Sequence, residues 1–271
     1  MSAPAAELRD LALDVGRQAA ALVRRRREQP VEVADTKSSS VDVVTEADRA
    51  SEELIHRLLT AARPDDAFLG EEGGTAEGTT GVRWVVDPID GTVNFLYGLP
   101  QYAVSIAAEQ DGTVVAGVVI NAATGAEYAG VLGGGSTRDG RPLTVRPTPP
   151  LAETLVITGF SYDAALRGLQ AAAVTRLLPL VRDIRRLGSC ALDLCHLAEG
   201  SADAYLEEGV NLWDHAAAGL VAREAGARTL LVTGVGGREL LVAAPEPGFD
   251  GFLAAVTEAG FMASPPPGTA E

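Results

Sequence analysis

Two aspartates, Asp87 and Asp90, follow an apolar run and stand directly before a Gly-Thr pair in the stretch "RWVVDPIDGTVNF". Two carboxylates about 4 Å apart repel each other by roughly 4 kcal/mol at an effective dielectric constant of about 20. A turn, in which aspartate bonds its own backbone, explains one of these residues more easily than two. Magnesium explains both, because it binds carboxylate oxygens and keeps waters that a phosphate can displace. The pair therefore favours a metal site, with an ordinary turn as the alternative.

The same stretch argues against one phosphatase mechanism. Phosphatases with a D-x-D-G-T signature use an aspartate nucleophile two residues before the second aspartate, and this chain has Pro88 at that position. Without the nucleophile, a mechanism through an aspartyl phosphate is not expected.

Composition sets limits on the class of protein and its partners. The 271 residues are 46% hydrophobic and 22% charged, which predicts a globular chain with a sizeable core. No apolar run of about 18 residues and no signal-like N-terminus are present, so we expect a cytoplasmic protein that does not bind membranes. The net charge of −15 argues against nucleic acid as a partner. Cys190 and Cys195 fall on different faces of a predicted helix, so no disulfide is expected.

Hydrophobic periodicity predicts the elements that must position the acids. We expect helices over 5–28 and from the Thr45 cap to Pro64, a loop over "FLGEEGG", and a strand over 83–86. An antiparallel meander is predicted for 102–109, 113–121 and 126–132.

From about residue 150, strands and helices alternate, which predicts an α/β arrangement. The predicted strands cover "TLVITGF", 183–187, "ADAYLEE", 228–232 and 239–243, and the predicted helices cover 163–178, the segment after Ser189, "DHAAAGLVAREAGA" and 248–259. We therefore expect an N-terminal α+β half over 1–149, a C-terminal α/β half over 150–262 and a tail over 263–271, packed as one catalytic unit.

Four segments, "KSSSVDVVTEAD", "GEEGG", "DPIDGTVNF" and "WDHAAAGLVAREAGA", resemble in order and spacing the signatures of the inositol monophosphatase family. The likeness runs over roughly residues 5–260 and is greatest to the bacterial inositol-1-monophosphatase branch. The resemblance implies an α/β layered sandwich in which helix and sheet layers alternate. It also implies a Mg²⁺-dependent, lithium-sensitive homodimer.

The resemblance also implies a ligand set. Glu71, Asp87 and the backbone carbonyl of Ile89 would bind one Mg²⁺, and Asp87, Asp90 and Asp214 would bind a second. Glu71 would reach a third, weaker metal through water. The four carboxylates and two Mg²⁺ ions balance in formal charge.

By the same resemblance, Thr92 and Asp48 would orient and deprotonate the attacking water beside Glu71, with in-line displacement and no phosphoenzyme. Backbone N–H groups of Gly91 and Thr92 would hold the phosphate, and Lys37 would lie on the phosphate side.

On the alcohol side, the resemblance implies that Glu207 binds inositol hydroxyls together with Asp214. Gly188, Ser189 and Cys190 would lie beside the ring, although the family often has threonine and alanine where this chain has Ser189 and Cys190.

Each acid also has a structural explanation when it is considered alone. Asp48 could complete the Thr45 cap, Asp214 could cap a helix, and Glu71 could be a solvated loop acid. His56, His196 and His215 lack the spacing of a zinc site. The four motifs in register favour the metal site over these explanations.

The leading hypothesis is hydrolysis of myo-inositol monophosphate to inositol and phosphate. Histidinol phosphate, sugar phosphates including fructose bisphosphate, NADP and 3′-phosphoadenosine phosphate are alternatives with the same chemistry. The absence of an aromatic cluster near 188–214 argues against the nucleotides. A different alternative is a non-catalytic regulatory or binding protein with the same fold.

Overall fold

The computed structural model describes residues 3–263 except 30, 32 and 37–42. The described residues form seven α-helices: α1 Ala5–Arg27, α2 Glu46–Ala62, α3 Thr92–Tyr97, α4 Ala164–Leu177, α5 Cys190–Ala198, α6 Leu212–Glu224 and α7 Phe249–Glu258. Short 3₁₀ helices lie at η1 Leu151–Glu153, η2 Leu178–Leu180 and η3 Glu246–Gly248. None of the helices in this part of the chain combines the length and the apolar character needed to cross a membrane.

The strands belong to two main sheets and one small ribbon. The larger sheet has the order β10 Arg141–Pro142, β9 Gly135–Arg138, β8 Glu127–Val131, β7 Thr113–Asn121, β6 Ala103–Gln110, β5 Val82–Asp90, β3 Ala67–Gly70 and β4 Thr75–Ala76. The smaller sheet has the order β12 Asp183–Arg185, β11 Leu155–Thr158, β13 Ala204–Glu208, β15 Glu239–Pro245 and β14 Ala227–Thr233. A two-stranded ribbon pairs β1 Val33–Thr36 with β2 Val43–Thr45.

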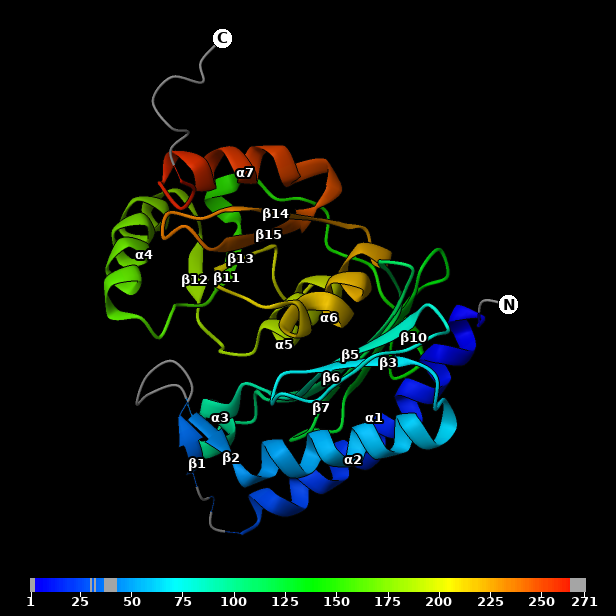
Figure 1. The fold of residues 1–271 in the computed structure, drawn as a ribbon. Helices are drawn as coiled ribbons and strands as arrows, with labels where there is room; N and C mark the ends of the chain where they lie inside the picture. The colour runs from blue at the N-terminus through cyan, green and yellow to red at the C-terminus, as the bar shows by residue number, and fades with distance from the viewer. Residues whose placement is uncertain (1–2, 30, 32, 37–42, 264–271) are drawn as a thin grey trace.

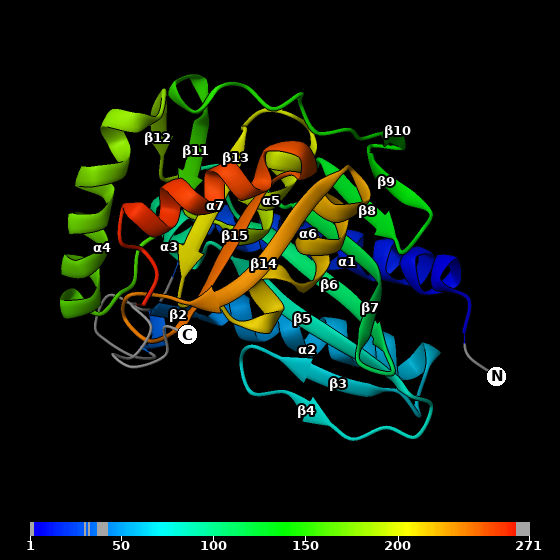
Figure 2. The same cartoon turned by 90° about the horizontal axis from the view of Figure 1, so that it is seen from above.

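Helices and sheets stack in alternating layers, as Figure 1 shows. One apolar cluster joins α1 and α2 to the larger sheet, a second surrounds α5 and α6 between the two sheets, and a third joins the smaller sheet to α4 and α7. Figure 2 shows α7 lying over the smaller sheet. The expected α/β sandwich of alternating layers is therefore confirmed.

Most of the predicted elements are confirmed, including α1, α2, the meander β6–β7–β8 and the later alternation of strands and helices. The predicted loop over "FLGEEGG" is wrong for Phe68–Gly70, which belongs to β3 and pairs with β5 in parallel. The strand predicted for 83–86 is too short, because β5 continues to Asp90. Cys190 and Cys195 are both buried and free, as expected.

The division into halves at residue 149 stays a prediction. Helices α5 and α6 follow that boundary in sequence, yet one face of this helical layer covers the larger sheet and the other faces the smaller sheet. The layer between the sheets is therefore shared by both segments of the chain.

Close seating of α6 on the larger sheet depends on glycine. A Cβ atom at Gly117 of β7 would lie 2.6 Å from the carbonyl oxygen of Ala217 and 2.8 Å from its Cα. Gly130 of β8 lies in the same way beneath the backbone of Val221, with 3.3 Å between a built Cβ and the Val221 Cα. Small residues on both surfaces let the helix backbone approach the sheet, which sets the position of the first turn of α6.

We predict that Gly117→Ala lowers the free energy of unfolding by about 1–3 kcal/mol, because the added methyl group meets backbone that cannot move aside. Urea unfolding followed by circular dichroism measures the change. Gly168→Ala is the matched control, since Gly168 lies on the exposed face of α4 with open space around it and should gain up to about 1 kcal/mol. A Gly117→Ala protein as stable as the wild type would contradict the close packing.

Candidate active site

Asp87 and Asp90 lie on β5 itself, at a β-bulge. Asp87 pairs with Ser105 of β6 and Asp90 with Ala103, so three steps along β5 match two steps along its partner. In a regular strand, side chains three residues apart point to opposite faces, and the extra residue of a bulge changes this alternation. The bulge therefore turns both carboxylates toward the same space. The backbone N–H of Ile89 donates to Asp87 Oδ1 at 3.0 Å within it.

Gly91 ends the strand and begins α3 in the left-handed conformation, with φ of 91°. A Cβ atom there would lie 2.7 Å from the carbonyl oxygen of Gln101 and 3.1 Å from that of Gly188. Glycine is required both for the backbone angle and for this close approach of two other segments. This explains the glycine that directly follows the second aspartate.

Glu71 follows β3, which runs parallel to β5 with Gly70 opposite Val86. The N–H of Glu71 donates to the carbonyl oxygen of Val86 at 3.2 Å, so the side chain emerges beside Asp87. Parallel pairing, rather than a free loop, therefore sets where Glu71 lies.

A buried glutamate that sequence reasoning missed holds the turn after Glu71. The Glu52 carboxylate accepts hydrogen bonds from the N–H of Glu72 at 2.8 Å and of Gly74 at 2.9 Å. A Cβ atom at Gly70 would lie 2.3 Å from this carboxylate, and one at Gly74 would lie 2.7 Å from it. The glycines of "GEEGG" thus make room for a side chain from α2.

Side chains from the first turns of α2 form hydrogen bonds with three parts of the site. Ser51 donates to the carbonyl oxygen of Pro88 at 3.2 Å, and Glu52 binds the turn after Glu71. Asp48 accepts a hydrogen bond from the Thr92 hydroxyl at 3.1 Å through its Oδ1. Since 48, 51 and 52 are spaced three and four residues apart, one face of the helix carries all three side chains.

Asp48 serves a second purpose through its other oxygen. Its Oδ2 accepts from the backbone N–H of Thr45 at 2.8 Å and from the Thr45 hydroxyl at 2.5 Å, which completes a capping box. Asp48 therefore does complete the Thr45 cap, and it does so through Oδ2, while Oδ1 binds the Thr92 hydroxyl. Burial raises the pKa of Asp48 to about 6, and hydrogen bonds from Thr45 limit the rise.

Asp214 lies in the first turn of α6, where the Asn211 N–H donates to its Oδ2 at 2.6 Å. It is the third helical residue of a capping box, and Asn211 is the cap, so the alternative that Asp214 itself caps the helix is wrong. The close seating of α6 on Gly117 brings this turn over the end of β5.

One ligand atom each from Glu71, Asp87 and Asp214 lies within 4.8 Å of the others. Burial and repulsion by Glu71, Asp90 and Asp214 raise the pKa of Asp87 well above its usual range. Burial, with repulsion by Glu71 and Asp90, raises the pKa of Asp214 in the same way. An all-oxygen donor set of this density suits a hard divalent cation.

Asp90 is close enough to repel the carboxylates of this cluster, but its hydrogen-bond donors come from the start of α5. Its Oδ2 accepts from the Ser189 hydroxyl at 2.5 Å and from the N–H of Ala191 at 2.7 Å, at the start of α5. Burial raises the pKa of Asp90 to about 7, against these two hydrogen bonds, which lower it. Ser189 is 1% exposed, so its described contact is with Asp90 and its predicted substrate contact stays a prediction.

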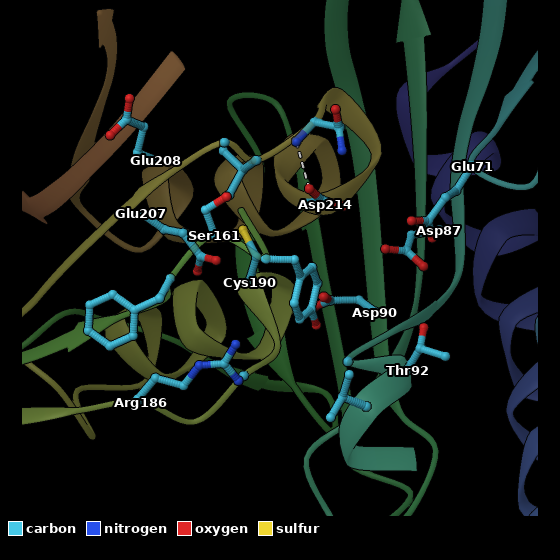
Figure 3. A pocket seen from close by; sticks show the side chains of 18 of the residues that line it. Glu71, Asp87, Asp90, Thr92, Ser161, Arg186, Cys190, Glu207, Glu208 and Asp214 are labelled. Carbon is cyan, nitrogen blue, oxygen red and sulfur yellow. Dashed lines mark hydrogen bonds between the residues drawn. The ribbon is translucent and has the colours of Figure 1, made fainter. Parts of the chain in front are cut away.

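The carboxylates line one side of a cavity of about 360 Å³. Figure 3 shows Glu207 and Arg186 on the side opposite Asp87 and Glu71, and Cys190 lies between the two sides. Gly91, Thr92 and Gly188 also line the cavity, whereas Lys37 lies outside the described residues. Sequence reasoning missed Arg186, Arg238, Phe160, Ser161 and Tyr162, of which only Arg186 stands next to a recognised segment.

The sequence model of the inositol monophosphatase family matches residues 5–259. This chain belongs to the inositol monophosphatase family. It is 44% identical to the inositol-1-monophosphatase SuhB of Mycobacterium tuberculosis, over 93% of each chain. It is also 38% identical to the Nus factor SuhB of Pasteurella multocida, over 80% of this chain and 82% of that one.

Among solved structures, SuhB of Mycobacterium tuberculosis superposes with a TM-score of 0.82 at 40% sequence identity. The match covers 96% of this chain and 99% of that chain. Membership of this family and the inositol-1-monophosphatase relatives support phosphatase activity, which is a hydrolase activity.

We predict that Glu52→Gln lowers the free energy of unfolding by about 1–3 kcal/mol, because one N–H of the turn loses its charged acceptor. Glu53→Gln removes the same charge from an exposed neighbour on α2 and should change stability by no more than about 0.5 kcal/mol. Urea unfolding compares the two. Equal effects would mean that Glu52 does not hold the turn.

The carboxylate cluster should also make stability depend on pH when metals are removed. An acid whose pKa is higher in the folded than in the unfolded state binds more protons when folded, so the folded state loses stability as pH rises between the two values. For Asp90 the folded value is about 7 and the ordinary value is 3.8.

In EDTA, the wild-type free energy of unfolding should therefore fall between pH 5 and pH 8. Asp87→Asn should reduce that fall by at least about 1 kcal/mol, since it removes the carboxylate repelled by the other three. Asp65→Asn, at an exposed position, is the control. Urea titrations at both pH values test this, and identical slopes for the two variants would contradict it.

Proposed function

We propose that this chain is a Mg²⁺-dependent phosphomonoesterase that hydrolyses myo-inositol monophosphate to inositol and phosphate. The observation that carries the proposal is the convergence of Glu71, Asp87 and Asp214, which come from three distant segments and lie within 4.8 Å of one another. Repulsion among acids brought this close is unfavourable unless a cation joins them, and the raised pKa values of Asp87 and Asp214 express that cost.

The residues that would hold Mg²⁺ are Glu71, Asp87, Asp90 and Asp214, with the carbonyl oxygen of Ile89. No histidine or cysteine belongs to the described acidic group, which favours magnesium over zinc. When bound, Mg²⁺ polarises phosphoryl oxygens and lowers the pKa of coordinated water. The proposed site binds two Mg²⁺ ions and, with lower affinity, a third.

Thr92 and Asp48 are the proposed proton acceptors. The Thr92 hydroxyl donates to Asp48 Oδ1 at 3.1 Å and has a second acceptor, the Ile89 carbonyl oxygen, at 3.0 Å. This geometry leaves the Thr92 oxygen free to accept a proton from the attacking water while its own proton passes to Asp48. Asp48 is fully buried and pinned by Thr45, so the pair is positioned before the substrate arrives.

The phosphate would meet the backbone N–H groups of Gly91 and Thr92 where α3 begins. The proposed role of Lys37 in binding the phosphate rests on the family resemblance alone. The alcohol would face Glu207, whose carboxylate accepts hydrogen bonds from hydroxyls, and Gly188 and Cys190 would lie beside it. Arg186 lines the same region and adds donors for hydroxyl oxygens.

Nucleotide esters remain among the candidate substrates for a structural reason. Residues 188–214 contain no aromatic cluster, which by itself disfavours nucleotides. Phe160 and Tyr162 reach the cavity from a different segment, so an aromatic surface is present after all. Histidinol phosphate and sugar phosphates are the other members of the panel.

A regulatory, non-catalytic role is the second candidate, because one relative carries the name Nus factor. The Thr92–Asp48 pair supports catalysis, since a purely structural metal would need only the carboxylates. The homodimer, the cytoplasmic location and the lithium sensitivity remain predictions.

We expect the wild type to release phosphate from myo-inositol monophosphate with Mg²⁺, and Asp90→Asn to lower kcat by at least about 100-fold. Thr92→Ala should lower kcat by about 100- to 10,000-fold while metal affinity, measured by titration calorimetry, stays within about threefold. A phosphate-release assay over the whole panel ranks the substrates by kcat/KM.

Turnover unaffected by Asp90→Asn would exclude the proposed metal site. A large loss of metal affinity in Thr92→Ala would mean that Thr92 is a ligand-positioning group rather than a proton acceptor. No phosphate release from any ester would favour the regulatory candidate.

A further inference from the structure

Glu207 is held by a buried tyrosine on its own strand. Tyr205 and Glu207 lie two residues apart on β13, so their side chains point to the same face. The Tyr205 hydroxyl donates to Glu207 Oε2 at 3.0 Å, and Tyr205 is 0% exposed. Glu207 thus receives its hydrogen bond from a hydroxyl group that is removed from water.

Gly159 provides the space into which the Glu207 carboxylate fits. It follows β11, which runs parallel to β13 with Thr158 opposite Leu206. A Cβ atom at Gly159 would lie 2.0 Å from Glu207 Cδ and Oε1 and 2.1 Å from Oε2. Any larger residue at this position would push the carboxylate out of its place.

Glu207 is otherwise loosely constrained. Within the described residues, the bond from Tyr205 is the one hydrogen bond assigned to its carboxylate, and Oε1 is left for a ligand. Arg186, on the same side of the cavity, acts on it through charge. A glutamate has three rotatable side-chain bonds, and binding through it costs less when its conformation is already set.

We infer that Tyr205 is a positioning residue that, together with the space over Gly159, fixes Glu207 to accept hydroxyls of the substrate alcohol. This pair thereby sets the preference for polyol phosphates over phosphate esters that lack hydroxyls. The inference rests on the proposed function, because it assigns Glu207 to the alcohol side of the same cavity.

The test compares kcat/KM for myo-inositol 1-phosphate with kcat/KM for cyclohexyl phosphate, a similar alkyl ester without hydroxyls. Tyr205→Phe removes only the hydroxyl, and Gly159→Ala places a methyl group whose three nearest atoms belong to the movable end of Glu207. Each should lower the ratio of the two values about five- to thirtyfold, mainly through KM for the inositol ester. In a Glu207→Gln background, neither change should lower the ratio by more than about twofold.

Tyr128→Phe is the matched control. Tyr128 is also buried, and its hydroxyl also donates to a glutamate, Glu199, at 2.9 Å, but neither residue lines the cavity. This variant should keep the wild-type ratio, which separates loss of a buried hydroxyl in general from loss of the one beside Glu207. Urea unfolding shows that each variant is folded before its kinetics are compared.

The result that supports the inference is a reduced ratio in Tyr205→Phe and Gly159→Ala but not in Tyr128→Phe. A wild-type preference for the inositol ester that both cavity variants retain would overturn the inference alone. Equal losses on both esters would do so as well, because they indicate a general structural effect. A wild type without any preference would overturn the proposed substrate class and the inference with it.

Discussion

Repulsion among carboxylates that are partly or wholly removed from water is the constraint on which the rest of the site depends. Asp87 and Asp90 sit on one bulged strand, and Glu71 and Asp214 are brought to them from other elements. Each approach raises the free energy of the folded chain when no cation is present. The surrounding structure must therefore hold these side chains firmly, and its hydrogen bonds are concentrated on them.

Two helices and three glycines supply that support. Helix α2 ties down the bulge, the turn after Glu71 and the Thr92 hydroxyl through Ser51, Glu52 and Asp48. Helix α6 carries Asp214 and can approach the sheet because Gly117 has no side chain. Gly70 and Gly74 leave room for Glu52 in the same way. Packing and polar contacts thus serve the same end, since both fix where negative charge is placed.

On the alcohol side of the cavity, a single acid, Glu207, is positioned in a similar way. Glu207 has a buried donor in Tyr205 and an open space over Gly159, much as Glu52 has two N–H donors and two glycines. In both cases a carboxylate occupies the space that a missing side chain leaves. Gly70, Gly74 and Gly159 therefore leave space for acids, whereas Gly91 is needed for its left-handed backbone and for the close approach of two other segments.

The sequence alone determined the order of helices and strands and the cap at Thr45, because periodicity and capping patterns are local properties, and its resemblance to the family singled out Glu71, Asp87 and Asp214, which the fold brings together. Tertiary structure decided that β5 carries both aspartates on a bulge, that Glu52 and Tyr205 position other acids, and that Phe160 and Arg186 line the cavity. Each of these depends on contacts between segments far apart in the chain, such as that between Glu52 and Glu72, which are 20 positions apart. No local pattern encodes such contacts, since they arise only when the layers pack.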